Sequence, residues 1–206
     1  MSTPTNLFLV RHAEVAEAYH RVFIGGMDVE LSALGHQQAQ ACAQYCRSLR
    51  WDAVYASPMK RVQQTMAPFR GQFTSQPEIL NDLREVDVGE WTGLHWEEVG
   101  TRFQVDFYQW LHLIETSRVP GGESGPDFRE RVERALDRIR QQHPGQQVAV
   151  FAHGGVIRMI LAVLLGLPLT RTAMFAVEYA GLTEVALHPG REAEIQRLNF
   201  TPWKHF

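Results

Sequence analysis

The chain has 206 residues, of which 45% are hydrophobic and 21% are charged, and its formal net charge at pH 7 is −3. This composition supplies apolar material for one substantial core, so we expect a single domain over residues 1–206. No run of Lys and Arg interleaved with aromatic residues occurs, which argues against a nucleic-acid partner.

Neither targeting nor membrane insertion is indicated by the apolar segments. The first apolar run ends at Val10, too early for the apolar region of a signal peptide. The longest later run, Ile157 to Leu169, contains Arg158 and is shorter than a bilayer requires. We therefore expect a soluble, cytoplasmic protein without a membrane partner.

The two cysteines, Cys42 and Cys46, lie four residues apart in an expected helix. Such a pair would suit either a shared metal or simple packing, but no second His/Cys pair at ligand spacing lies nearby. We interpret both as packing residues and expect no disulfide framework and no metal site.

Apolar runs of strand length alternate with segments of helical periodicity along the chain. Strands are expected at 6–10, 52–56, 148–152, 175–179, 182–188 and 194–200. Helices are expected at 32–49, after Ser57 as cap with Pro58 in the first turn, at 97–115, from 124 or 127 to 142, and at 156–165. The stretch 81–93 is expected to be loop.

This alternation predicts an α/β fold, a three-layer α/β/α sandwich with a central, mostly parallel sheet. Ligands of such sheets bind at the carboxyl ends of the strands. His12 and His153 each follow an expected strand directly, so we expect the fold to bring these two residues together.

Four ordered motifs carry residues suited to phosphate chemistry. They are Arg11-His12-Ala13-Glu14, Ser57 to Thr65 with Arg61, Leu83 to Gly93 with Glu85, and Ala152-His153-Gly154-Gly155. In this order, and over nearly the whole chain, the motifs resemble the histidine phosphatase superfamily, also called the phosphoglycerate mutase-like family. The resemblance implies the same central, mostly parallel sheet and a reaction that uses no metal and no cofactor.

Residue roles follow from the resemblance, position by position. His12 corresponds to the nucleophile, Arg11 and Arg61 to phosphate-binding arginines, and His153 to a second histidine of the phosphate pocket. A neutral imidazole is a good nucleophile near pH 7, and guanidinium groups offset phosphate charge without a metal. A protonated His153 would add a donor, and the backbone N–H of Gly154 is expected to approach a phosphate oxygen.

Glu85 corresponds to the proton donor, which protonates the departing alkoxide and then deprotonates the attacking water. Asp87 and Glu90 are rivals by proximity. We prefer Glu85 because its spacing to the glycines and tryptophan that follow matches the family, at Gly89, Trp91 and Gly93.

Substrate contacts are expected from the segment after the first strand, at Ala18, Phe23 and Gly25. Many relatives have Asn where this chain has Ala18, and His20 or water would have to supply the missing polar group. Tyr108 and Trp110 would either line the substrate entrance or pack within their helix.

Two further motifs remain open at this stage. Glu14 is expected to be a structural carboxylate, orienting an arginine. Gly121-Gly122-Glu123-Ser124 resembles a family loop near the substrate mouth, but a turn followed by a helix cap explains the same residues equally well.

Together these features favour a phosphomonoester phosphatase acting through phosphohistidine on a small phosphorylated metabolite. One alternative is a mutase-type phosphoryl transferase, but the family's mutases are longer and carry Glu-Arg-His-Tyr-Gly where this chain has Glu85-Val86-Asp87-Val88-Gly89. The other is a non-catalytic phosphate binder, against which the retention of all five core residues argues. The short chain most resembles the α-ribazole phosphatase and broad-specificity branch. The oligomeric state stays open, with a homodimer as one option.

Overall fold

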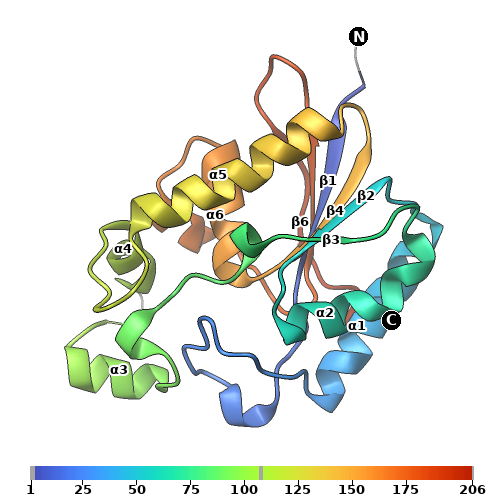
Figure 1. Cartoon of the computed structure of the whole chain (residues 1–206). Helices are drawn as coiled ribbons and strands as arrows, with labels where there is room; N and C mark the ends of the chain where they lie inside the picture. The colour runs from blue at the N-terminus through green and yellow to red at the C-terminus, as the bar shows by residue number, and fades with distance from the viewer. Residues whose placement is uncertain (1–2, 107–108, 206) are drawn as a thin grey trace.

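The computed structural model describes residues 3–106 and 109–205, in which a mixed sheet of six strands runs through the centre (Figure 1). The order across the sheet is β3-β2-β4-β1-β5-β6. The strands are β1 (Thr5–Arg11), β2 (Ala53–Ala56), β3 (Glu78–Ile79), β4 (Gln147–Ala152), β5 (Leu182–Leu187) and β6 (Glu194–Phe200).

Strands β3, β2, β4 and β1 are parallel, whereas β5 runs antiparallel to β1 and β6 antiparallel to β5. Parallel neighbours need crossover connections, and here these connections contain the helices that cover the sheet. The predicted α/β fold with a mostly parallel sheet is confirmed.

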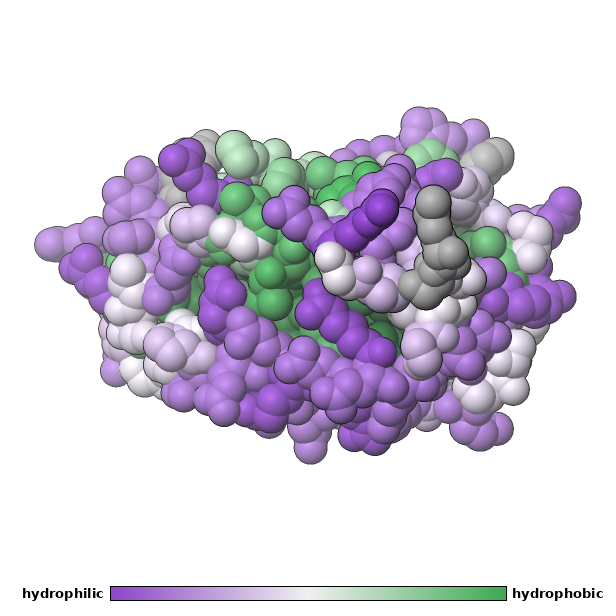
Figure 2. Space-filling view, turned by 90° about the horizontal axis from the view of Figure 1, so that it is seen from above, coloured by the Kyte–Doolittle hydropathy of each residue, from purple (hydrophilic) through white to green (hydrophobic). Residues whose placement is uncertain are grey.

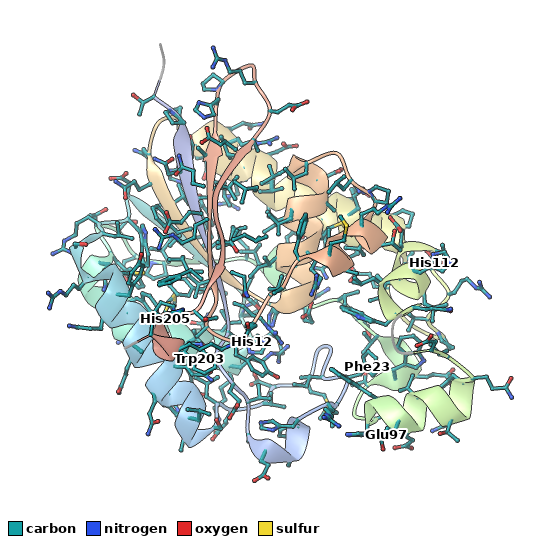
Figure 3. All side chains as sticks on the ribbon, turned by 180° about the vertical axis from the view of Figure 1, so that it is seen from behind. His12, Phe23, Glu97, His112, Trp203 and His205 are labelled. Carbon is teal, nitrogen blue, oxygen red and sulfur yellow. The ribbon has the colours of Figure 1, made fainter. Side chains whose placement is uncertain are left out.

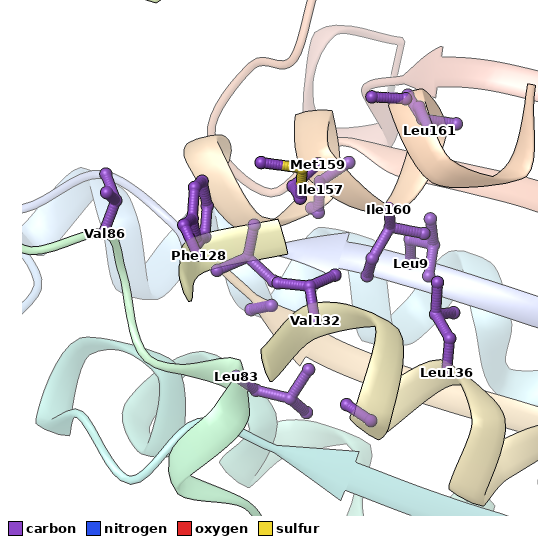
Figure 4. Close-up of a cluster of buried hydrophobic side chains, with 14 of the residues drawn as sticks. Leu9, Leu83, Val86, Phe128, Val132, Leu136, Ile157, Met159, Ile160 and Leu161 are labelled. Atoms are coloured by element: carbon purple, nitrogen blue, oxygen red, sulfur yellow. The ribbon is translucent and has the colours of Figure 1, made fainter. Parts of the chain in front are cut away.

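Helices cover both faces of the sheet (Figure 1). The α-helices of the described residues are α1 (Ala33–Tyr45), α2 (Lys60–Met66), α3 (Trp96–Phe103), α4 (Trp110–Glu115), α5 (Gly125–Gln142) and α6 (Gly154–Leu164). Alternate residues of β1 point to opposite faces, so Leu7 and Leu9 join the apolar cluster under α5 and α6, while Phe8 and Val10 join the cluster under α1 and α2. Figure 4 shows the first of these clusters.

Two expected elements differ in the structure. The expected helix 97–115 is divided into α3 and α4, because Gln104 adopts a left-handed conformation (φ 54°) at the end of α3. The expected strand 175–179 does not form a strand, and its carbonyls accept hydrogen bonds from arginine side chains instead of a ladder partner.

The predicted caps have different outcomes. Ser32 and Ser124 cap α1 and α5 as expected, through their side-chain oxygens. Ser57 was expected to cap the helix after β2, and this is wrong: Met59 is the N-cap of α2, without a side-chain cap bond. The hydroxyl of Ser57 bonds to a histidine ring.

The end of the sheet at which β1 and β4 begin has a mixed surface. Figure 2, seen from above, shows apolar side chains gathered in a central hollow and hydrophilic ones around its rim.

Within residues 3–106 and 109–205, none of the helices has the length and apolarity needed to cross a membrane. Cys42 and Cys46 are buried and free in the cluster under α1, as the packing interpretation predicts.

Gly35 provides a test of the fold, since it lies in the first turn of α1 against the backbone of Glu14, the last residue of the first motif. A Cβ at Gly35 would lie 2.1 Å from the Glu14 carbonyl oxygen. A Gly→Ala change in a helix normally raises the free energy of unfolding by about 1 kcal/mol. Here we expect Gly35→Ala to lower the free energy of unfolding by about 1–3 kcal/mol because the backbones would be forced apart. Urea denaturation measures this, with Gly71→Ala, where a Cβ meets nothing within 4 Å, as the control. A stabilised Gly35→Ala protein would contradict the close approach.

Candidate active site

The two histidines of the sequence motifs meet at the carboxyl ends of β1 and β4. The strands pair in parallel with Arg11 opposite Ala152, so the residue that follows each strand is a histidine. The rings of His12 and His153 lie 5.3 Å apart between centroids, edge to face. Figure 3 shows His12 at this end of the sheet.

His12 is buried, with 4% of its surface exposed. Its Nδ1 lies 2.9 Å from the Ala13 carbonyl oxygen. A carbonyl only accepts, so Nδ1 carries the proton and the lone pair of the neutral ring is on Nε2. Burial, followed by the charges of Arg61 and Arg11, lowers the pKa of His12 well below its ordinary value. The ring is therefore a neutral imidazole at physiological pH.

Arg61 comes from the first turn of α2 and is 1% exposed. Its Nη1 donates to the Met27 carbonyl at 2.7 Å and its Nη2 to the Gly25 carbonyl at 2.9 Å. Its Nε donates to Nδ1 of His153 at 3.2 Å. Burial lowers the pKa of Arg61 to about 10, so the guanidinium keeps its charge at neutral pH.

His153 lies behind Arg61, and both of its ring nitrogens have protein partners. Nδ1 accepts from Arg61, and Nε2 lies 2.8 Å from the Ser57 hydroxyl. Burial, then the charge of Arg61, lower the pKa of His153 well below its ordinary value. The structure thus shows a neutral ring that orients Arg61, and the expected protonated donor to phosphate stays a prediction.

Arg11 points into the same cavity from the end of β1. Its Nη1 donates to the Val177 carbonyl at 2.6 Å, and its guanidinium lies 4.1 Å from the centroid of the Tyr179 ring. Its Nε is buried without a hydrogen-bond partner. A buried donor without a partner is costly, so an anion that accepts from this Nε would be stabilised there.

Glu85 is the carboxylate that faces this cavity, whereas its rivals Asp87 and Glu90 are not among the lining residues. Its Oε2 accepts from the backbone N–H of Gly155 at 3.2 Å and its Oε1 from that of Val86 at 3.0 Å. The Asp87 carboxylate instead accepts from the N–H of Gly89. The preference for Glu85 therefore has geometric support.

A cavity of ≈ 390 Å³ contains the exposed parts of these groups. The predicted site residues that line it are Arg11, His12, Phe23, Gly25, Arg61, Glu85 and Gly154. Ala18 is exposed and outside the lining, as is His20, whose Nε2 bonds to the Val15 carbonyl. Trp110 lines the cavity, which supports the entrance interpretation, while Tyr108 lies outside the described residues.

Several lining residues were not predicted from the sequence. These are Tyr19, Arg21, Val22, Ile24, Val86, Val88, Trp96, Gly155, Arg158, Val177 and Tyr179. Arg158 had a signal, since it is the one charged residue of an apolar helical run and follows Gly154 by one turn. Tyr179 had none, because only the folded chain brings its ring within 5.6 Å of the His12 ring.

The two motifs left open also have structural answers. Glu14 accepts from the Ser32 hydroxyl at 2.8 Å and so bonds to a helix cap, not to an arginine. Ser124 caps α5 and Glu123 pairs with Arg131, and neither lines the cavity. The turn-and-cap interpretation of this loop is the one that the structure supports. Across the described ranges, no group of three or more His, Cys, Asp or Glu side chains is arranged to hold a metal ion.

The structure thus brings a neutral buried histidine, two arginines and a carboxylate to one cavity. The model of the histidine phosphatase superfamily (branch 1) matches residues 7–201. The chain belongs to this superfamily. Its relatives include phosphoserine phosphatase 1 of Hydrogenobacter thermophilus, 31% identical over 95% of this chain and 92% of that protein. A metal-independent phosphoserine phosphatase of Arabidopsis thaliana is 32% identical over 77% of this chain and 68% of its own length.

Solved structures show the same fold. The α-ribazole phosphatase of Shigella flexneri aligns with a TM-score of 0.83 at 24% identity, covering 96% of this chain and 97% of that one. Family and relatives together make this histidine phosphatase a phosphomonoester hydrolase.

The buried neutral histidines predict how stability depends on pH. Their pKa values are lowered in the folded state, so below the ordinary value of 6.5 the unfolded chain binds protons that the folded chain does not. The two neutral histidines contribute fully to the free energy of unfolding above pH 6.5. As the pH decreases below 6.5, we expect the free energy of unfolding to decrease by up to about 1.4 kcal/mol per pH unit for each histidine. Urea denaturation between pH 7 and pH 5 measures the slope. His12→Gln and His153→Gln should each reduce it, and an unchanged slope in both variants would contradict buried neutral rings.

Proposed function

We propose that this histidine phosphatase hydrolyses a small phosphorylated metabolite without a metal, through a phosphohistidine formed at Nε2 of His12. The observation that supports this most is the state of His12, a neutral imidazole with its Nε2 lone pair free in a cavity lined by Arg11 and Arg61. The hydrogen bonds of both guanidinium groups go to backbone carbonyls and an imidazole, so their charges are available to an anion.

The reaction follows from these positions. Nε2 of His12 attacks phosphorus while the bond from phosphorus to the alcohol oxygen breaks, and Glu85 gives its proton to that oxygen. Arg11 and Arg61 stabilise the charge on the equatorial oxygens. Water then attacks the phosphohistidine and gives a proton to Glu85, which restores the acid and releases phosphate and a free His12.

Apolar side chains of the cavity lining support a proposal for the alcohol part of the substrate. They include Phe23, Trp96, Trp110, Val88 and Val177, and we call them the apolar wall. Phe23 is also in ring contact with Trp96 (6.4 Å between centroids), which fixes part of this wall. A small zwitterion such as phosphoserine would leave these apolar side chains in contact with water. The wall therefore favours an alcohol with a ring or another apolar body, in keeping with an α-ribazole phosphate-like or broad specificity.

Phosphoenzyme trapping tests the nucleophile. The wild-type protein, freed of metals by a chelator, should still form an acid-labile, base-stable phosphoenzyme, and inorganic phosphate or vanadate should compete with the substrate. His12→Ala should abolish both turnover and labelling because no other side chain in the cavity presents a free imidazole. His36→Ala, a change on the exposed surface of α1, is the control and should label normally. Labelling that persists in His12→Ala, or activity that returns only with a divalent ion, would overturn the mechanism.

The apolar wall predicts a preference between two esters of matched leaving-group chemistry. Both 2-phenylethyl phosphate and phosphoserine are primary alkyl esters, so their difference reports the wall and not the acid. We expect kcat/KM to favour 2-phenylethyl phosphate, and Trp110→Ala to remove about 10–100-fold of it, the equivalent of about 1.5–3 kcal/mol for a buried aromatic ring. Phosphoserine should be affected little. Phe103→Ala, which removes an aromatic ring outside the cavity lining, is the control. Equal losses for both esters would remove the wall from substrate recognition.

A further inference from the structure

A buried ion pair outside the cavity holds the segment that carries Glu85. Arg131 is on the second turn of α5 with 4% of its surface exposed, and Glu123 precedes that helix. The Arg131 guanidinium meets the Glu123 carboxylate with two parallel bonds, Nε to Oε1 at 2.6 Å and Nη2 to Oε2 at 2.8 Å. Neither residue lines the cavity, so neither touches the substrate.

The remaining donors of Arg131 bind the backbone that leads into Glu85. Nη1 donates to the carbonyls of Asp82 at 2.7 Å and Arg84 at 2.8 Å, and Nη2 donates to the carbonyl of Glu85 itself at 3.3 Å. A guanidinium has five N–H donors in one plane, and here all five have acceptors. Lysine has three donors and no fixed plane, so it cannot reproduce this set.

Glu123 holds the same segment on the far side of Glu85. Its backbone N–H donates to the Asp87 carbonyl at 2.9 Å, and its Oε2 accepts weakly from the Asp87 N–H at 3.4 Å. The next residues of the segment also meet this loop, since the N–H of Glu90 donates to the Pro120 carbonyl at 2.9 Å. A Cβ at Gly89 would lie 2.2 Å from that carbonyl oxygen, so the two loops are in direct backbone contact.

The apolar core fixes the pair in turn. Phe128, one turn before Arg131, places its ring 4.7 Å from the guanidinium carbon. Figure 4 shows Phe128 and Val132 of α5 in one cluster with Leu83 and Val86, which flank Glu85 in sequence. The guanidinium therefore contacts the same apolar cluster that packs Leu83 and Val86, the residues before and after Glu85.

We infer that Arg131 and Glu123 are positioning residues that set the place of the Glu85 carboxyl group relative to the departing oxygen. The inference rests on the proposed acid role of Glu85. Among the described residues, the carboxylate itself accepts hydrogen bonds from two backbone N–H groups, those of Val86 and Gly155. Its location therefore depends on where the backbone is held. General acid catalysis requires hydrogen-bond reach to the leaving oxygen, and a displacement of about 1 Å can cost about 10²-fold in rate.

Arg131→Lys tests this, because the lysine keeps a charge for Glu123 but loses the set of carbonyl bonds. Rapid-quench measurement of phosphoenzyme formation should show a loss of about 10²-fold with an alkyl phosphate and of less than about 10-fold with p-nitrophenyl phosphate, whose leaving group needs no proton. Competitive inhibition by inorganic phosphate should stay as in the wild type. Arg129→Lys, also on α5 but bonded to Glu133 and the Leu167 carbonyl, is the matched control.

A double-mutant comparison separates positioning from general damage. Once Glu85→Gln has removed the acid, adding Arg131→Lys should cost little more in phosphoenzyme formation from the alkyl ester. Should Arg131→Lys fail to fold, Glu123→Gln, which keeps the shape of the side chain, should show the same dependence on the leaving group to a smaller degree. Equal slowing of both esters, or a full further loss in the Glu85→Gln background, would overturn the inference while leaving the acid role intact. If Glu85→Gln slowed phosphoenzyme formation equally from the alkyl ester and from p-nitrophenyl phosphate, the acid role would be overturned, and the inference with it.

Discussion

The buried charge of Arg61 is the constraint on which the rest of the site depends. Taking a guanidinium out of water costs several kcal/mol unless its donors are satisfied, and here carbonyls of Gly25 and Met27 and the ring of His153 do so. These partners belong to two separate parts of the chain and Arg61 to a third, so the segment after β1, the end of β4 and the start of α2 must all meet at one point. Burial, together with this charge, disfavours protonation of His12 and keeps its imidazole neutral. A dianion is the group that would complete this arrangement.

The two ends of the cavity have different structural origins. The phosphate end is built on regular elements, with Arg11 and His12 at the end of β1 and Arg61 on α2. The wall that would face the alcohol comes mainly from loops and short helices, through the segments 19–25 and 177–179 and the helix residues Trp96 and Trp110. Loops tolerate substitution far better than central strands. Relatives with different substrates can therefore share the phosphate end of this site.

Much of the phosphate end was predictable from the sequence, because His12 and His153 each follow a buried apolar run and such runs form central parallel strands. Of the wall, Phe23 and Trp110 were expected from the sequence, whereas Trp96 and Tyr179 were not, since they reach the cavity only through long-range packing. Local periodicity also extended one helix over 97–115, because the apolar spacing continues past Gln104, whose left-handed backbone has no sequence signal. Ser57 shows the same limit: Ser-Pro before a helix resembles a cap, and only the folded chain places its hydroxyl on His153.

Four arginines in and around the site donate hydrogen bonds from their guanidinium groups to main-chain carbonyls. Arg11 holds Val177, Arg158 holds Thr172 and Phe175, Arg61 holds Gly25 and Met27, and Arg131 holds Asp82, Arg84 and Glu85. A carbonyl is present whatever side chain its residue carries. These arginine–carbonyl bonds therefore do not depend on the side chains of the residues whose carbonyls accept them. Substitutions in the surrounding loops can change which substrates fit the cavity while the bonds stay in place.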